Sequence, residues 1–201
     1  MKKDAIGTIC CCLFLAIPAL CFGAGGNTWY GSANAGVAIA TDSDLKVTGS
    51  PTVKMEYDTG YTVGGAVGYM LERFRIEGEI SYQANDVDKI DGLSLDPLSA
   101  EAIALTLLVN GYWHFYTGSG FIPYITAGLG ATNIQFEMTN EPDEDDTVFA
   151  YQLGLGVWFR LSETVALDCR YRYQGAADAE FTDAEIGVAS NNITIGLVVA
   201  F

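Results

Sequence analysis

Apolar and polar residues alternate along most of the chain, most clearly in residues 61–83. Successive side chains of a β-strand point to opposite faces, so this pattern predicts strands rather than helices. In the second half of the stretch, one face holds aromatic, aliphatic and glycine residues: Phe74, Ile76, Gly78, Ile80 and Tyr82. The other face is polar and charged: Arg75, Glu77, Glu79, Ser81 and Gln83. A short break at residues 71–73 predicts a hairpin with one apolar and one polar face.

The same alternation recurs and predicts eight strands, at residues 29–40, 56–70, 74–83, 101–116, 121–135, 148–161, 165–173 and 191–201. Tight turns alternate with longer polar loops, which we place at residues 41–54, 84–100, 136–147 and 174–190. Strands of about ten residues in this rhythm are typical of a transmembrane β-barrel. The predicted fold class is therefore all-β, an eight-stranded antiparallel barrel of the outer-membrane type. An even number of strands puts both chain termini on the periplasmic side, with the tight turns.

The charged residues within these strands indicate which face meets lipid. Seven of them share the polar face: Arg75, Glu77, Glu79, Arg160, Asp168, Arg170 and Arg172. A soluble ligand-binding barrel would have its charges outside, whereas an Arg or Lys facing lipid at mid-membrane costs roughly 2–4 kcal/mol. We therefore expect these seven residues to line the barrel interior and to pair there. If these charged residues pair with one another, they form a structural network that fills the interior. The alternative is that they line a gated ion path.

Aromatic residues on the apolar face gather near both ends of the predicted strands. Near the tight turns they are Trp29, Tyr69, Phe74, Trp113, Phe115, Phe159 and Phe201. Near the loops they are Tyr61, Tyr82, Tyr151, Tyr171 and Tyr173. Two such girdles indicate two membrane interfaces. An amphipathic soluble sandwich is the alternative.

The first residues have the organisation of a secretory signal peptide. Residues 1–3 are basic, residues 6–22 are largely apolar, and small residues follow at 23–26. We expect a signal peptide at residues 1–24, cleaved within 23–26, and a barrel domain at residues 25–201. This signal also favours the membrane barrel over the soluble sandwich.

Two other interpretations of this segment are weaker. A membrane anchor is disfavoured because the apolar run is short and broken by Pro18. A lipoprotein site at Cys21 is disfavoured because Leu20 stands where a small residue would be expected. Of the cysteines, only Cys169 lies beyond the signal, which leaves no internal disulfide and no cysteine metal site. The net charge of −15 argues against a nucleic-acid partner.

Several sequence segments resemble those of the outer-membrane β-barrel superfamily of small surface antigens, opacity-type and OmpA-like barrels. They lie at residues 60–69, 75–82, 123–130 and 166–173, and the final alternation ends in Phe201. The resemblance implies a multi-pass barrel in the bacterial outer membrane, in contact with outer-membrane lipid. It also implies that Phe201 is part of an assembly signal, through which the last strand meets the outer-membrane assembly machinery.

Candidate chemistry is sparse. The single histidine, His114, is expected inside the barrel, where packing is favoured over a lipid hydrolase that needs a histidine at the lipid face. The acidic run 141–146 lacks the ligand spacing of a calcium loop, so a solvated loop is favoured over a cation site. The glycine pairs at 128–130 and 154–156 are expected to make room for interior aromatics such as Tyr124 and Trp158 rather than to bind a dinucleotide. We predict no catalytic, cofactor-binding or metal residues, and Cys169 is expected to face lipid.

The sequence thus predicts a non-enzymatic outer-membrane surface protein, antigen-like or adhesin-like, with a structural role in the membrane. Its acidic loops would form the interaction surface for a host or surface ligand. The first alternative is a narrow porin or channel, and the second is a lipid-modifying enzyme.

Overall fold

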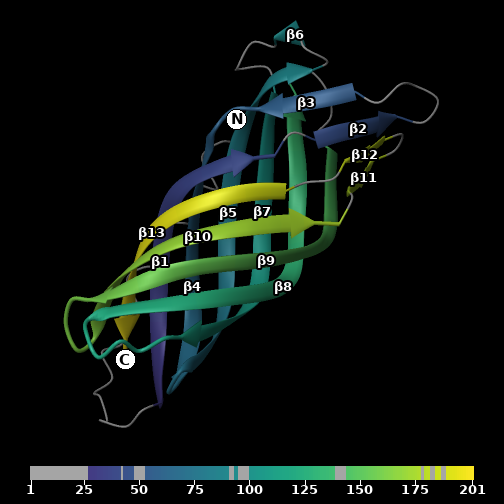
Figure 1. Ribbon diagram of the computed structural model, residues 1–201. Coiled ribbons are helices and arrows are strands. Elements are labelled where there is room, and N and C mark those ends of the chain that lie inside the picture. Colours follow the sequence, from purple (N-terminus) through teal and green to yellow (C-terminus); the bar gives the residue numbers. More distant parts are fainter. Residues whose placement is uncertain are drawn as a thin grey trace, which may run out of the picture.

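A computed structural model describes residues 27–41, 43–47, 53–90, 93–94, 100–138, 144–177, 179–181, 184–186 and 189–201. Eight long strands form the body of the molecule (Figure 1): β1 (Asn27–Ala40), β4 (Gly60–Leu71), β5 (Phe74–Ile90), β7 (Ala100–His114), β8 (Phe121–Met138), β9 (Glu144–Arg160), β10 (Val165–Ala176) and β13 (Ala189–Ala200). No helix long and apolar enough to cross a bilayer occurs among the described residues.

These eight strands close into a barrel. Each is antiparallel to its two neighbours, in the order β1-β4-β5-β7-β8-β9-β10-β13. The ring closes between the first and last strands, where Tyr30 pairs with Ala200 and Ala40 pairs with Ser190. Short connections join β4 to β5, β7 to β8 and β9 to β10 at one end, the turn end; the opposite end is the loop end. The predicted eight-stranded antiparallel barrel is confirmed.

Several strands run further than the alternation indicated. β5 continues to Ile90, while β8 and β9 stay paired as far as Phe136 opposite Glu144. The expected loops at residues 84–100 and 136–147 are therefore partly strand. Backbone pairing needs no particular side-chain pattern, so a ladder can persist after the apolar face has ended.

Five short strands lie at the loop end, four of them within predicted loops and β3 across a predicted loop and strand: β2 (Ser43–Val47), β3 (Val53–Tyr57), β6 (Leu93–Ser94), β11 (Ala179–Phe181) and β12 (Ala184–Ile186). They correct several predictions: the expected loop 84–100 contains β6, and the expected loop 174–190 contains β11 and β12. The loop 41–54 contains β2 and the start of β3, and the strand predicted at 56–70 is two strands, β3 and β4, separated at residues 58–59. The paired order β11-β12-β2-β3-β5 forms a sheet that leans away from the barrel rim (Figure 1).

The outer surface of the barrel is apolar. Leu107 and Val109 of β7 are 63% and 64% exposed, and Leu129, Leu153 and Ile193 on other strands are exposed by more than half. Polar and charged side chains instead occupy the buried interior, among them Arg75, Glu77, Glu79, Asn110, Gln152, Asp168, Arg170, Arg172 and Asn192. An apolar exterior around a polar interior is the arrangement that lipid requires.

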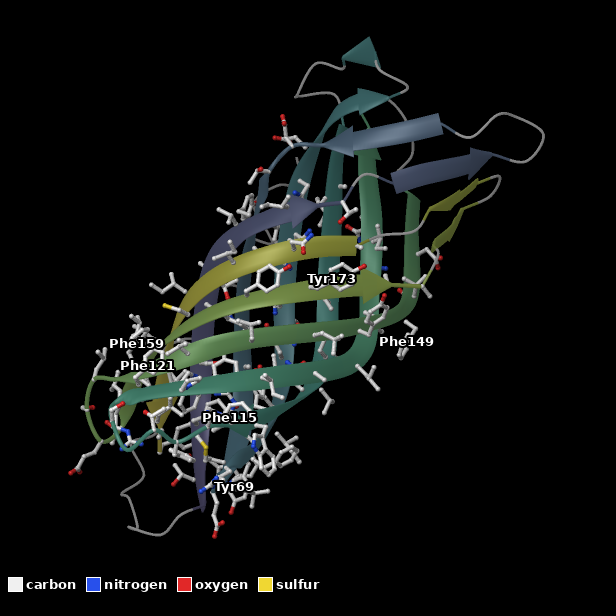
Figure 2. The ribbon with its side chains drawn as sticks, viewed as in Figure 1. Tyr69, Phe115, Phe121, Phe149, Phe159 and Tyr173 are labelled. Carbon is white, nitrogen blue, oxygen red and sulfur yellow. The ribbon has the colours of Figure 1, made fainter. Side chains whose placement is uncertain are left out.

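Aromatic rings occur at both ends of the apolar band (Figure 2). At the turn end, two tilted or edge-on pairs lie on the outer face: Trp29 with Tyr69 at 5.0 Å and Phe121 with Phe159 at 5.5 Å between ring centroids. At the loop end, Tyr61 lies 6.1 Å from Tyr82 and Tyr151 lies 6.4 Å from Tyr173. Two aromatic bands on an apolar surface mark the two membrane interfaces.

Barrel closure gives a direct test. With every spanning strand paired on both sides, no sheet edge is available from which SDS can begin to unfold the protein. We expect unboiled and boiled samples to migrate differently on an SDS gel. Identical migration by a sample whose circular dichroism shows β-structure would contradict a closed barrel.

Candidate functional site

The interior of the barrel, the lumen, is occupied by side chains rather than open. At the turn end its filling is aromatic and contains Tyr30, Tyr112, Tyr124, Trp158 and His114, all at most 7% exposed. These residues come from β1, β7, β8 and β9, where the strand alternation points them inward. Eight strands enclose a space just wide enough for side chains to fill.

Arg75 of β5 lies at the centre of these rings with no exposed surface. Its guanidinium carbon is 3.5 Å from the ring centroid of Tyr112 and 4.3 Å from that of Trp158. The rings of Tyr30 and Tyr124 follow at 5.2 and 5.3 Å. None of its side-chain nitrogens has a hydrogen-bond partner within the described part of the chain. Cation–π attraction, which strengthens without water, is therefore the main contact of this charge.

The charge of Arg75 is balanced by Glu77, whose Oε2 lies 4.0 Å from the guanidinium. Glu77 is held in place by two phenols. The Tyr30 hydroxyl donates to Oε2 at 2.6 Å and the Tyr112 hydroxyl donates to Oε1 at 2.5 Å. Both carboxylate oxygens thus accept short hydrogen bonds to a charged group, which are stronger than bonds between neutral groups.

A second cluster lies further toward the loop end and centres on Glu79. Arg172 and Arg170 both donate to this carboxylate, the latter at 3.3 Å, and Asn110 donates at 2.7 Å. Arg170 also bonds Asp168 at 2.8 Å, and Asp168 accepts the Tyr124 hydroxyl at 2.6 Å. Four strands are therefore tied together across the lumen, and each buried carboxylate has a cationic partner.

Six of the seven charged residues predicted for the interior make these contacts. The seventh, Arg160, does not: it is exposed at the turn end, because it is the last residue of β9. The tyrosines that donate hydrogen bonds to the carboxylates were not among the predicted site residues. The strand alternation could have identified them, because Tyr30, Tyr112 and Tyr124 occupy positions between apolar outward-facing residues and therefore lie on the polar face.

Glycines make room for this filling at particular points. A Cβ on Gly156 would contact the ring and hydroxyl of Tyr124, which confirms the expected space for that residue. At Gly128 the space is taken by Asn110 and Gln152 rather than by an aromatic ring. Gly68 of β4 was not singled out from the sequence, yet a Cβ there would overlap the Tyr30 hydroxyl that bonds Glu77.

Two further candidate residues, His114 and Cys169, lie within the described part of the chain. His114 is 1% exposed and packs against the rings of Trp158 and Tyr124, with centroids at 4.9 and 5.4 Å. Cys169 is a half-buried free cysteine on the outward-facing register of β10. The described residues contain no group of three metal-binding side chains. Of the acidic run 141–146, residues 141–143 lie outside the described residues.

Comparison with known families agrees with this architecture. The family model described as "Outer membrane protein beta-barrel domain" matches residues 9–201. The chain belongs to this family. It is a bacterial outer-membrane β-barrel protein, and the predicted location is confirmed.

Individual relatives add detail. The outer membrane protein PagN of Salmonella typhimurium is 26% identical over 117 residues, which are 48% of this chain and 49% of PagN. The chain thus aligns with about half the length of this relative. The crystal structure of Neisserial surface protein A matches with a TM-score of 0.62 at 20% identity, covering 90% of this chain and all of that one. OprG from Pseudomonas aeruginosa gives 0.60 at 18% identity, covering 88% and 98%. At such identities the structural likeness establishes the fold alone.

The lumen contacts make Arg75→Ala informative. Removing the guanidinium leaves Glu77 buried without its cation, and breaking one side of a buried pair costs about 3–5 kcal/mol, less if water enters. We expect the variant to unfold at lower urea concentration than wild type and to conduct more ions in planar bilayers. Arg160→Ala removes the same side chain from an exposed position and should change neither property. Large, steady conductance of the wild type together with unchanged stability of Arg75→Ala would falsify a filled lumen.

The assembly role of Phe201 stays a prediction. Its backbone N–H donates to the Trp29 carbonyl at 2.8 Å, so the terminal residue takes part in barrel closure. We expect deletion of Phe201 to reduce membrane insertion in cells several-fold while refolding in detergent is largely retained, since the other pairs of β13 remain. Phe201→Tyr keeps an aromatic terminus and should insert normally. Normal insertion of the deletion variant would exclude an assembly signal.

Proposed function

We propose that this protein is a non-conducting, non-enzymatic barrel that anchors an interaction surface outside the outer membrane, as antigen-like and adhesin-like surface proteins do. The observation that carries the proposal is the filled lumen: Arg75, Glu77, Tyr112 and Arg172 are at most 1% exposed in mid-barrel. A barrel without a water path has little use as a pore, so its function is expected at its loop end.

The loop end supports this assignment because it is elaborated. β5, β8 and β9 run for 17, 18 and 17 residues, compared with 12 for β4, β10 and β13. The additional sheet of β2, β3, β11 and β12 extends from β5 in the same region. An ordered sheet beyond the aromatic band presents more surface to a partner than short loops would.

The sequence at this end is acidic, which indicates the chemistry of a ligand. Residues 141–146 read Glu-Pro-Asp-Glu-Asp-Asp, and the segment 84–100 carries several further aspartates. A surface of one charge attracts partners of the opposite charge and repels its own kind. We therefore propose that the host or surface ligand presents a basic patch.

The alternative functions have less support. A channel would need a continuous path past the Arg75 cluster. A lipid-modifying enzyme would need its catalytic groups at the lipid face, whereas His114 is enclosed by rings in the lumen. We therefore propose no reaction for this protein.

The test is adhesion of bacteria that express the protein. In a non-adherent host strain, we expect the wild type to increase attachment to cultured cells. Replacing Glu144, Asp145 and Asp146 of β9 by Asn and Gln should lower attachment several-fold, and added salt should do the same. The matched control is Glu163→Gln, one acidic residue at the turn end, which should attach like wild type. Antibody labelling of intact cells verifies equal surface display.

Two outcomes would contradict the proposal. One is wild-type attachment equal to that of the empty strain at full surface display. The other is a steady ion conductance of the wild type in planar bilayers, which would favour the channel.

A further inference from the structure

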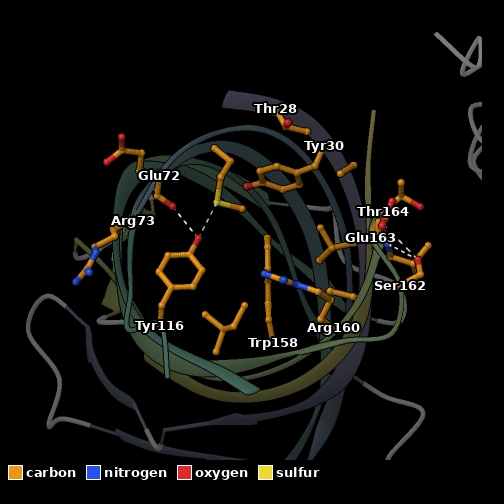
Figure 3. Close-up of a pocket in the computed structure, with 16 residues that line it drawn as sticks. Thr28, Tyr30, Glu72, Arg73, Tyr116, Trp158, Arg160, Ser162, Glu163 and Thr164 are labelled. Carbon is orange, nitrogen blue, oxygen red and sulfur yellow. Dashed lines mark hydrogen bonds between the residues drawn. The ribbon is translucent and has the colours of Figure 1, made fainter. Parts of the chain in front are cut away.

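A cavity of about 570 Å³ opens at the turn end of the barrel, next to the aromatic filling of the lumen (Figure 3). Its floor is made by Tyr30, Ile122 and Trp158, which are 1%, 3% and 7% exposed. Met70 and Val198 contribute further apolar wall. This volume is within the range of pockets that bind small molecules, about 300–1,000 Å³. The turn end faces the periplasm in barrels of this kind.

Charged residues lie around the mouth, but only one cation is directed across it. Figure 3 shows Arg73 pointing away from the cavity, while the guanidinium of Arg160 reaches inward beside Trp158. Arg160 forms no ion pair with any residue that the structure describes. The carboxylate of Glu72 also points outward (Figure 3), and the Tyr116 hydroxyl is occupied, since it donates to the Glu72 carbonyl at 2.7 Å.

The aromatic rings of the floor already contact a cation from the other side, which disfavours a cationic ligand. Aromatic rings generally attract cations, but both rings of the floor already make cation–π contacts with Arg75. Its guanidinium carbon is 4.3 Å from the centroid of the Trp158 ring and 5.2 Å from that of the Tyr30 ring. A second cation on the cavity side would compete with Arg75 for the same two rings and would be repelled by Arg160. An anionic group next to Arg160 would meet a planar fork of donors suited to a carboxylate.

We propose that the cavity binds a small aromatic carboxylate from the periplasm. Its ring packs against Trp158, Tyr30 and Ile122, and its carboxylate accepts hydrogen bonds from Arg160. Because Trp158 separates this site from the Arg75 cluster, the ligand is bound and not conducted. The site is distinct from the interaction surface at the loop end, so each can be tested without the other.

Trp158 provides the readout. The chain has three tryptophans, and the other two, Trp29 and Trp113, are 54% and 46% exposed on the outer face. Replacing both by Phe leaves Trp158 as the only indole fluorophore, and the heat-dependent gel shift verifies folding of this parent protein. The probe is the carboxylate anion of 4-nitrophenylacetic acid, added to protein in lipid nanodiscs. Its nitroaromatic ring quenches indole fluorescence on contact. Its neutral counterpart is 4-nitrobenzyl alcohol.

We expect saturable quenching by the carboxylate and only weak, non-saturating quenching by the alcohol. Arg160→Gln in the same parent should weaken carboxylate binding about tenfold, as expected for loss of a charge-assisted hydrogen bond. Arg73→Gln removes a cation of the same rim whose side chain points away from the cavity, so this variant should bind the carboxylate like the parent. Equal quenching by both probes, no saturation, or unchanged binding by Arg160→Gln would each overturn the proposal.

Discussion

The hydrocarbon core offers the backbone no hydrogen-bond partner, and this constraint determines the rest of the structure. Each spanning N–H and C=O group must be paired inside the protein, which sheets achieve only by closing on themselves. Closure between β1 and β13 satisfies the requirement. It also divides every spanning strand into a face toward lipid and a face toward a narrow interior, so the polar residues excluded from lipid gather in one confined space.

That confinement explains the unusual contacts of the interior. Buried charges lose their hydration and must be compensated by neighbours. Glu79 is compensated by two arginines and an amide, whereas Arg75 has one carboxylate at 4.0 Å and four aromatic rings. The phenols have two roles here, because the rings of Tyr30 and Tyr112 face the cation while their hydroxyls bond its counter-ion. Aromatic residues thus give the lumen both bulk and electrostatic balance.

The same constraint explains which features could be predicted from sequence. Within the membrane every second side chain must be apolar, so the alternation around Phe74–Tyr82 identified strands, faces and interior charges. Beyond the membrane, water meets both faces and the pattern fades, which is why β2, β6, β11 and β12 were expected as loops and β3 was not separated from β4. The sequence could not predict which interior groups would pair: Tyr124 and Asp168 are 44 positions apart, and their contact depends on the register of two strand pairings, β8 with β9 and β9 with β10. Arg160 shares the interior register, but its place at the last residue of β9 leaves it in the turn-end mouth.

The unequal strand lengths have a mechanical consequence. β8 and β9, which stay paired with each other to Phe136 and Glu144, exceed β4, β10 and β13 by five or six residues, and a strand rises about 3.3 Å per residue. One wall of the barrel is therefore longer than the other by about 15–20 Å, measured along the strands. The longer wall is a twisted, hydrogen-bonded ribbon continuous with the membrane-embedded barrel, so it resists bending better than a flexible linker of the same length. A molecule that pulls on the outer end of this wall transmits the force to the whole ring of strands, and the load is shared among their ladders.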